Sequence, residues 1–172
     1  MSIIKTILHK TPQWGKNCFF ADNAVIIGDV MMGNYCSIWF SAVIRGDVHY
    51  IKMGDNVNVQ DNVTIHGTYK KSPTRIGNNV SIAHNATVHG CTIEDNVLIG
   101  IGAIILDDAI IKNNSIVAAG AVVKKETIVE SGSLYAGVPA KLIKKIDANL
   151  LENEIHRIAS SYKQYASWYK NL

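Results

Sequence analysis

Three histidines in the middle of the chain have the type and spacing of metal ligands: His66, His84 and His89. Neutral imidazole is a common ligand of divalent metals, and three imidazoles leave a fourth position open on a tetrahedral ion. Such a site lowers the pKa of bound water towards about 7, so that hydroxide forms at neutral pH. The remaining histidines show no such clustering: His9, His49 and His156.

Polar residues in the same part of the chain could complete this site. Gln60 directly follows an apolar residue, one hexapeptide before His66, where its amide could orient a metal-bound hydroxide. Arg45, Asp47 and Asp61 could hold the ligands through hydrogen bonds. The alternative is that these charges make structural ion pairs, such as one between Arg45 and Asp61 of neighbouring subunits.

The elements that position these residues follow from a repeat of six, in which every sixth residue is apolar. The series, interrupted by short insertions and one deletion, is Phe20, Ile26, Met32, Ile38 and Ile44, then Met53, Val59 and Ile65, then Ile76, Ile82 and Val88, then every sixth residue from Ile93 to Tyr135. The residue four positions later is almost always small or β-branched. This period fits neither a helix nor a meander, but it fits short strands joined by tight turns, with three hexapeptides closing one triangular coil. The sequence therefore predicts a parallel β-helix, whose handedness the spacing leaves open.

The repeat also suggests where the chain divides. Residues 1–19 are expected to form a strand and a loop that cap the first coil, because the ends of a solenoid must be covered. The β-helix is expected to span residues 20–141. From 142 to 172 we expect a C-terminal helix, since apolar residues from Ile146 to Tyr169 approximate a 3.6-residue stripe that would pack along one face.

The coil register brings two of the histidines together. Ile65 and Val88 fall at equivalent points of successive coils, so His66 and His89 should project side by side, roughly 4.8 Å apart. His84 falls on a different face, where only a neighbouring subunit's pair could meet it. The spacing thus indicates a three-histidine metal site shared between subunits, or alternatively a set of hydrogen-bonded interface histidines.

Composition excludes several other classes of protein. The 172 residues are 48% hydrophobic and 18% charged, with a net charge of +3, which argues against disorder and gives no reason to expect nucleic acid as a partner. No apolar stretch approaches the ~20 residues of a membrane span. Three cysteines and the lack of a signal peptide favour a reducing, cytoplasmic location.

Five short segments are similar to those of a known family: VIRGD (43–47), NVQDN (58–62), IHG (65–67), SIAHNATVHGC (81–91) and GVPAK (137–141). With them the chain resembles, over nearly its whole length, the γ-class carbonic anhydrase-like proteins of the left-handed β-helix superfamily. The implied reaction is reversible hydration of CO2 to bicarbonate by a metal-bound hydroxide.

The resemblance also implies an assembly and a set of residue roles. The fold would be a left-handed parallel β-helix of hexapeptide repeats with a C-terminal α-helix packed along it, in a homotrimer with sites at the subunit interfaces. Zinc, or alternatively Fe2+ or Co2+, would be held by His66 and His89 of one subunit and His84 of the next. The other residues matched to family positions are Gln60, which would orient the nucleophile, Tyr162, which would approach the site, and the site or interface residues Arg45, Asp47, Asn58 and Asp61.

The loop that follows His66 departs from the family pattern. The archetypal enzyme has an acidic loop there with a glutamate that shuttles protons, whereas Gly67–Thr74 (GTYKKSPT) is short and has no carboxylate. We therefore expect a lyase with reduced turnover.

Two other classes of function compete with this one: an acyltransferase or CoA-thioester hydrolase on the same fold, and a non-catalytic metal-binding trimer. Clustered histidines argue against an acyltransferase, which would use one catalytic histidine beside a long acyl-CoA loop. We expect a small-molecule substrate, CO2 or bicarbonate, and neither nucleic acid nor a membrane as a partner.

Overall fold

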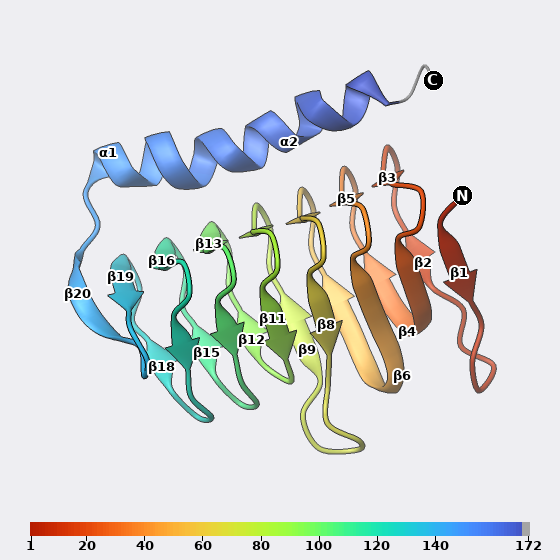
Figure 1. Ribbon diagram of the computed structural model, residues 1–172, viewed down its shortest axis with the longest axis horizontal. Helices are drawn as coiled ribbons and strands as arrows, with labels where there is room; N and C mark the ends of the chain where they lie inside the picture. The colour runs from red at the N-terminus through yellow and green to blue at the C-terminus, as the bar shows by residue number, and fades with distance from the viewer. Residues whose placement is uncertain (170–172) are drawn as a thin grey trace.

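The six-residue repeat folds into a parallel β-helix of about seven turns, with one helix along its side (Figure 1). The computed structural model describes residues 1–169. The expected fold class is therefore confirmed.

The coil has three faces, each built mainly from short parallel strands. The first face contains β3 (Phe19–Phe20), β5 (Ser37–Ile38), β7 (Asn58–Val59), β10 (Ser81–Ile82), β13 (Val97–Ile99), β16 (Ser115–Val117) and β19 (Ser133–Ala136). The second contains β1 (Ile3–Lys5), the first halves of β4 (Val25–Met32) and β6 (Val43–Met53), then β8 (Thr64–His66), β11 (Thr87–His89), β14 (Ile104–Ile105) and β17 (Val122–Val123). The third contains β2 (Gln13–Trp14), the second halves of β4 and β6, then β9 (Thr74–Ile76), β12 (Thr92–Ile93), β15 (Ile110–Ile111) and β18 (Ile128–Val129).

The core is the stack of aliphatic side chains inside the coil. On the first face Ile82 lies between Val59 of the preceding coil and Ile99 of the following one, and all three side chains are fully buried. Small residues such as Ala86 fill the corners, also without exposure to solvent. Each buried aliphatic side chain contributes roughly 1.5–3 kcal/mol relative to an exposed one.

The corners rely on residues that tolerate a positive φ. Asn56, Asn79 and Asn96 adopt this conformation in successive coils, with φ of 57°, 55° and 56°. Their amides also stack, because Asn56 donates to Asn79 at 2.9 Å and Asn79 donates to Asn96 at 3.1 Å. This row of hydrogen bonds keeps neighbouring coils in register at one corner.

The N-terminal segment covers the first coil. Strands β1 and β2 both pair in parallel with β4, so backbone groups that would otherwise lie at an open edge of the solenoid are hydrogen-bonded.

The C-terminal segment differs from expectation at its start. Lys141–Lys145 forms a strand, β20, which pairs antiparallel with β19, whereas we predicted helix from residue 142. The edge of β19 has no further coil to pair with, and this open edge overrides the helical tendency of the lysines. The helix then begins at Ala148, after Asp147, whose side chain accepts a hydrogen bond from the Leu150 N–H at 2.8 Å.

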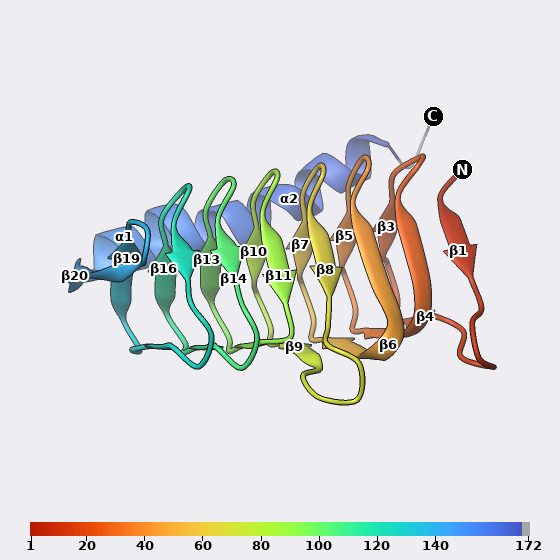
Figure 2. The ribbon, with the colours of Figure 1, turned by 60° about the horizontal axis from the view of Figure 1, so that its bottom comes forward.

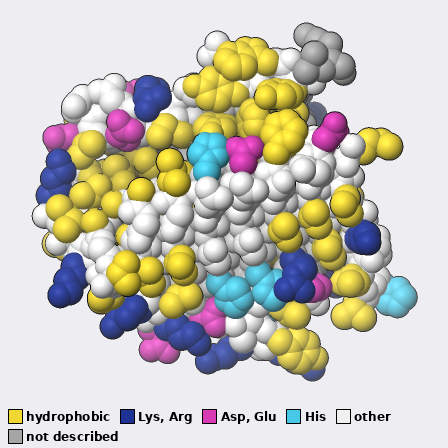
Figure 3. Space-filling view, viewed as in Figure 1, with side chains coloured by type: hydrophobic (Ala, Val, Ile, Leu, Met, Phe, Trp, Pro, Cys, Tyr) yellow, Lys and Arg dark blue, Asp and Glu magenta, His cyan; other side chains and the backbone are white. Residues whose placement is uncertain are grey.

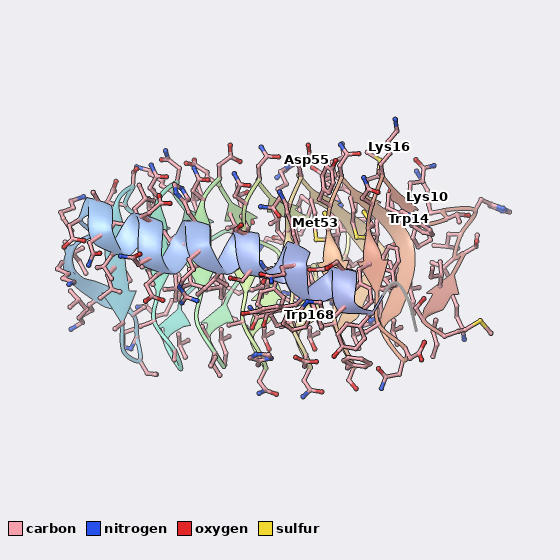
Figure 4. All side chains as sticks on the ribbon, turned by 90° about the horizontal axis from the view of Figure 1, so that it is seen from above. Lys10, Trp14, Lys16, Met53, Asp55 and Trp168 are labelled. Carbon is pink, nitrogen blue, oxygen red and sulfur yellow. The ribbon has the colours of Figure 1, made fainter. Side chains whose placement is uncertain are left out.

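The helix runs as α1 (Ala148–Leu150), a π-helical stretch η1 (Leu151–His156) and α2 (Arg157–Trp168). It lies lengthwise over the stack, with Trp168 over the N-terminal half of the coils (Figure 4). Its buried face includes Ile155, Ala159 and Ala166, and Ala166 packs with Phe19 and Trp39 of the coil. The expected helical positions 170–172 lie outside the described residues. In the described part of the chain, no helix is long and apolar enough to cross a membrane.

Candidate metal site

His66 and His89 end neighbouring strands and lie side by side. Strands β8 and β11 pair in parallel with His66 opposite His89, as the repeat predicted. His66 Nδ1 and His89 Nε2 are 3.2 Å apart, and both rings are partly buried.

An acidic side chain holds the other nitrogen of His66. His66 Nε2 donates to Asp47 Oδ1 at 3.0 Å, and Arg45 donates to the second oxygen of Asp47 at 2.7 Å. Burial works against ionisation of Asp47, but the hydrogen bond from His66 and the charge of Arg45 outweigh it and lower the pKa of this carboxyl.

His89 is held in the same way by Asp107. His89 Nδ1 donates to Asp107 Oδ1 at 2.5 Å, and Thr68 donates to the other oxygen at 2.6 Å. Burial again opposes ionisation, and the hydrogen bonds from Thr68 and His89 outweigh it and lower the pKa of Asp107.

When both imidazoles are neutral, these two contacts leave no proton between the remaining pair of ring nitrogens. An ionised carboxylate only accepts hydrogen bonds, so each neutral imidazole donates its N–H to its aspartate. The lone pair of its second nitrogen is then directed towards the other ring. Two lone pairs 3.2 Å apart repel each other unless a cation or a proton lies between them.

His84 belongs to a different part of the coil, the turn between β10 and β11. His84 Nδ1 lies 2.8 Å from Asp61 Oδ2, and Tyr162 of the helix places its hydroxyl 3.5 Å from His84 Nε2. The pKa of Tyr162 is raised to about 12 by burial, by the charge of Asp61 and by Tyr165, so the hydroxyl keeps its proton at neutral pH.

Gln60 lies beneath this turn and is buried. Its Oε1 accepts from the backbone N–H of His84 at 3.3 Å, and its Nε2 donates to Asn58 Oδ1 at 3.0 Å. Asn58 in turn donates to Ser81 at 2.7 Å, so both amides have a defined orientation.

The predicted site residues therefore fall into two groups. The two-histidine cluster consists of Arg45, Asp47, His66 and His89, together with Asp107. The one-histidine cluster consists of Asn58, Gln60, Asp61, His84 and Tyr162. Figure 3 shows histidine side chains in separate places on this face, some beside an acidic side chain near the helix and others beside basic side chains towards the opposite edge.

Neither cluster is a complete metal site. Among residues 1–169, no three His, Cys, Asp or Glu side chains of one chain come together in an arrangement that could hold a metal ion. Within the chain, Arg45 pairs with Asp47, and Asp61 pairs with His84 rather than with Arg45. Cys91 lies two residues after β11, but burial and the charge of Asp107 raise the pKa of its thiol to about 12, so the thiol stays protonated.

Comparison with known proteins agrees with the fold. The family model of the bacterial transferase hexapeptide (six repeats) matches residues 90–125. A "putative acetyltransferase" structure from Bacillus cereus superposes with a TM-score of 0.95 at 36% identity, over 99% of this chain and 98% of that one.

Two curated relatives indicate the family more closely. "Carbonic anhydrase" of Geobacillus kaustophilus is 43% identical over 95% of this chain and 88% of its own length. "Gamma carbonic anhydrase 2, mitochondrial" of Arabidopsis thaliana is 40% identical over 94% of this chain. The chain belongs to the γ-class carbonic anhydrase-like family. It spans 59% of the length of the plant relative.

Membership of the γ-class carbonic anhydrase-like family implies a bound metal, and the residues present fit one. Two nitrogens that are each about 2.0–2.1 Å from one tetrahedral ion lie about 3.3 Å from each other. His66 Nδ1 and His89 Nε2 are separated by 3.2 Å. When both rings are neutral and donate to their aspartates, these two nitrogens direct lone pairs towards each other. Imidazole donors suit zinc and iron alike, so the donor set does not select between these metals.

One residue of the candidate site, Asp107, could not be recognised from the motifs of the sequence. It lies 17 residues after Gly90, which is the offset between β11 and β14. That offset, applied to the residue next to His89, was the available signal.

Proposed function

We propose that the protein is a metal-dependent carbonic anhydrase that interconverts CO2 and bicarbonate. The observation that carries this proposal is the pair of facing imidazole nitrogens of His66 and His89, each ring fixed by an aspartate on its far side. With no cation between them, the lone pairs of the two neutral nitrogens repel each other. A divalent cation placed between them would instead be coordinated by both nitrogens.

The third ligand in this proposal is His84 of a neighbouring subunit in a homotrimer. Like the other two histidines, His84 has one ring nitrogen on an aspartate, because Nδ1 contacts Asp61, while Nε2 lies 3.5 Å from the Tyr162 hydroxyl. Aspartates that accept from metal-binding histidines orient the ring and raise its basicity. The separation of the two clusters on one chain supports a site completed between subunits.

The bound ion, which we propose to be zinc with Fe2+ or Co2+ as alternatives, would acidify a coordinated water and make it nucleophilic at neutral pH. The surrounding residues would orient the nucleophile and the substrate. Gln60 is held beside His84 by hydrogen bonds at both ends of its amide, so it can orient the attacking oxygen without losing further entropy. Tyr162 keeps its proton and can donate a hydrogen bond to an oxygen of CO2 or bicarbonate.

The test is stopped-flow CO2 hydration on protein loaded separately with zinc, cobalt and iron(II), with His89→Ala as the blank. We expect metal-dependent turnover above the blank, because removing one of three ligands empties the site. Turnover that is absent from a fully occupied wild-type site would contradict the proposal.

One observation favours a second candidate, hydrolysis of a thioester. An apolar cavity of about 400 Å³ adjoins His84 and is lined by Leu98, Ile101 and Ile158, among others. CO2 is much smaller than this cavity, whereas the acyl chain of a thioester would fill it. Metal-dependent release of thiol from short acyl-CoA substrates, together with no CO2 hydration, would favour this reaction. Full metal occupancy with neither activity would indicate a non-catalytic metal-binding trimer.

A further inference from the structure

Asp107 reaches the two-histidine cluster from the next coil. It lies in the turn between β14 and β15, directly above Gly90 in the register that pairs Val88 with Ile105. A Cβ at Gly90 would lie 2.5 Å from Asp107 Oδ1. The missing side chain at Gly90 thus leaves the space through which the carboxylate meets His89.

The two oxygens of Asp107 have separate partners. Oδ1 accepts from His89 Nδ1 at 2.5 Å. Oδ2 accepts from the Thr68 hydroxyl at 2.6 Å and lies 3.6 Å from Lys125 Nζ. Because Thr68 and Lys125 fix the orientation of the carboxylate, Oδ1 is held on the imidazole of His89.

Asp107 is also the most enclosed of the three aspartates that contact histidine. Its side chain is 7% exposed, against 18% for Asp47 and 33% for Asp61. Water screens a buried charge least, so the hydrogen bond from His89 to Asp107 should constrain the imidazole ring more than the hydrogen bonds to the other two aspartates do.

We propose that Asp107 is a positioning residue, which keeps the proton of His89 on Nδ1 and thereby presents Nε2 to the metal. The inference rests on the proposed function, since it takes His89 to be a ligand. It assigns a role to a residue outside the recognised motifs. It also assigns a structural role to the short β8–β9 loop, because Thr68 of that loop donates a hydrogen bond to Asp107.

The first residue of β9, Thr74, also connects the two histidine-bearing strands. The Thr74 hydroxyl donates to the backbone carbonyl of His66 at 2.5 Å and accepts from the Gly90 N–H at 3.0 Å. Thr68 in the loop and Thr74 directly after it therefore both contact the two-histidine cluster or the backbone beside it.

The test compares Asp107→Asn with Asp108→Asn in the full-length protein. Asp107→Asn keeps the shape of the side chain but replaces a charge-assisted hydrogen bond by a neutral one, which is about half as strong. Asp108 is the exposed neighbour, so its variant removes the same charge from the same turn without touching His89. Thr68→Val is a third variant that leaves the carboxylate but removes its anchor.

The first readout is affinity for Co2+, followed by its visible absorption and by competition with Zn2+. We expect Asp107→Asn to bind Co2+ about 10-fold more weakly or worse, Thr68→Val to be intermediate and Asp108→Asn to match the wild type. Equal affinities for Asp107→Asn and Asp108→Asn would overturn the proposal.

The second readout is the 15N spectrum of the histidine rings in metal-free protein, which reports the tautomer of each ring. We expect His89 to carry its proton on Nδ1 in the wild type and in Asp108→Asn, and to populate the Nε2-protonated tautomer more in Asp107→Asn, where the hydrogen bond is weaker. A wild-type His89 protonated on Nε2 would overturn the proposal. If the wild type failed to bind Co2+ at all, the proposed function would fail, while the tautomer comparison would still decide whether Asp107 holds His89.

Discussion

Gly90 is the residue whose lack of a side chain matters most to the candidate site. Its φ is +56°, and a Cβ there would lie 2.5 Å from Asp107 Oδ1 and 2.9 Å from Ser72 Cβ. A substitution therefore adds a steric clash beside His89 to the backbone strain.

We predict that Gly90→Ala lowers the free energy of unfolding by about 2–4 kcal/mol, from left-handed strain plus overpacking. It should also weaken zinc binding, because Asp107 must move away from His89. Gly120→Ala is the matched control, since its φ is +66° but no atom lies within 4 Å of the added Cβ. Urea denaturation and zinc titration of both variants measure the two effects. Equal zinc affinity in Gly90→Ala and Gly120→Ala would show that the space at Gly90 has no bearing on the site.

At the scale of elements, the β8–β9 loop anchors Asp107 through Thr68 but contains no acidic residue. It projects beyond the stack of coils (Figure 2). A backbone N–H of Thr68 donates to the carbonyl of Ser72 at 3.0 Å, which closes the loop on itself. Its side chains include tyrosine and lysines but no carboxylate that could accept a proton at neutral pH.

We predict that proton transfer to the solvent limits turnover in this protein. CO2 hydration should then rise about 10-fold or more with the concentration of a small buffer such as imidazole, at constant pH and ionic strength. Exchange of carbon between CO2 and bicarbonate at equilibrium, followed by 13C NMR, does not require that proton to leave and should be independent of buffer. A hydration rate that ignores buffer concentration would point to a shuttle group elsewhere in the chain.

At the scale of the whole molecule, the two clusters lie on different parts of the coil, and the proposed site requires one of each from two subunits. A chain that lacks His84 keeps an intact two-histidine cluster, and a chain that lacks His66 keeps an intact one-histidine cluster. Mixed assemblies can therefore rebuild a complete site where an intact cluster of each kind meets.

We predict that His84→Ala and His66→Ala each bind little zinc alone, and that refolding them together restores part of the wild-type zinc content. Elemental analysis of the purified mixed assembly measures the recovery. Mixing His66→Ala with His89→Ala is the control, because both variants damage the same cluster and no complete site can form. Zinc content in the single variants equal to that of the wild type would exclude the shared site.

Much of this arrangement could be predicted from the sequence because a solenoid converts spacing into position. Once the inward residues are identified, the offset of 23 residues between Ile65 and Val88 places His66 against His89, and the register of the strands confirms it. The same logic separated His84 from the pair. The helix was predicted from its 3.6-residue stripe, since an isolated amphipathic pattern needs only one apolar face to pack against.

Only the tertiary structure decided the contacts that depend on side-chain direction and on open edges. The contact between Asp107 and His89 depends on the space above Gly90 and on the anchoring of the carboxylate by Thr68, neither of which the repeat encodes. The approach of Tyr162 to His84 depends on how the helix packs against Trp39. Lys141–Lys145 became a strand because the edge of β19 was unpaired, a condition that exists only after the last coil has formed. Periodicity determined where each backbone position lies, whereas packing determined which side chains meet.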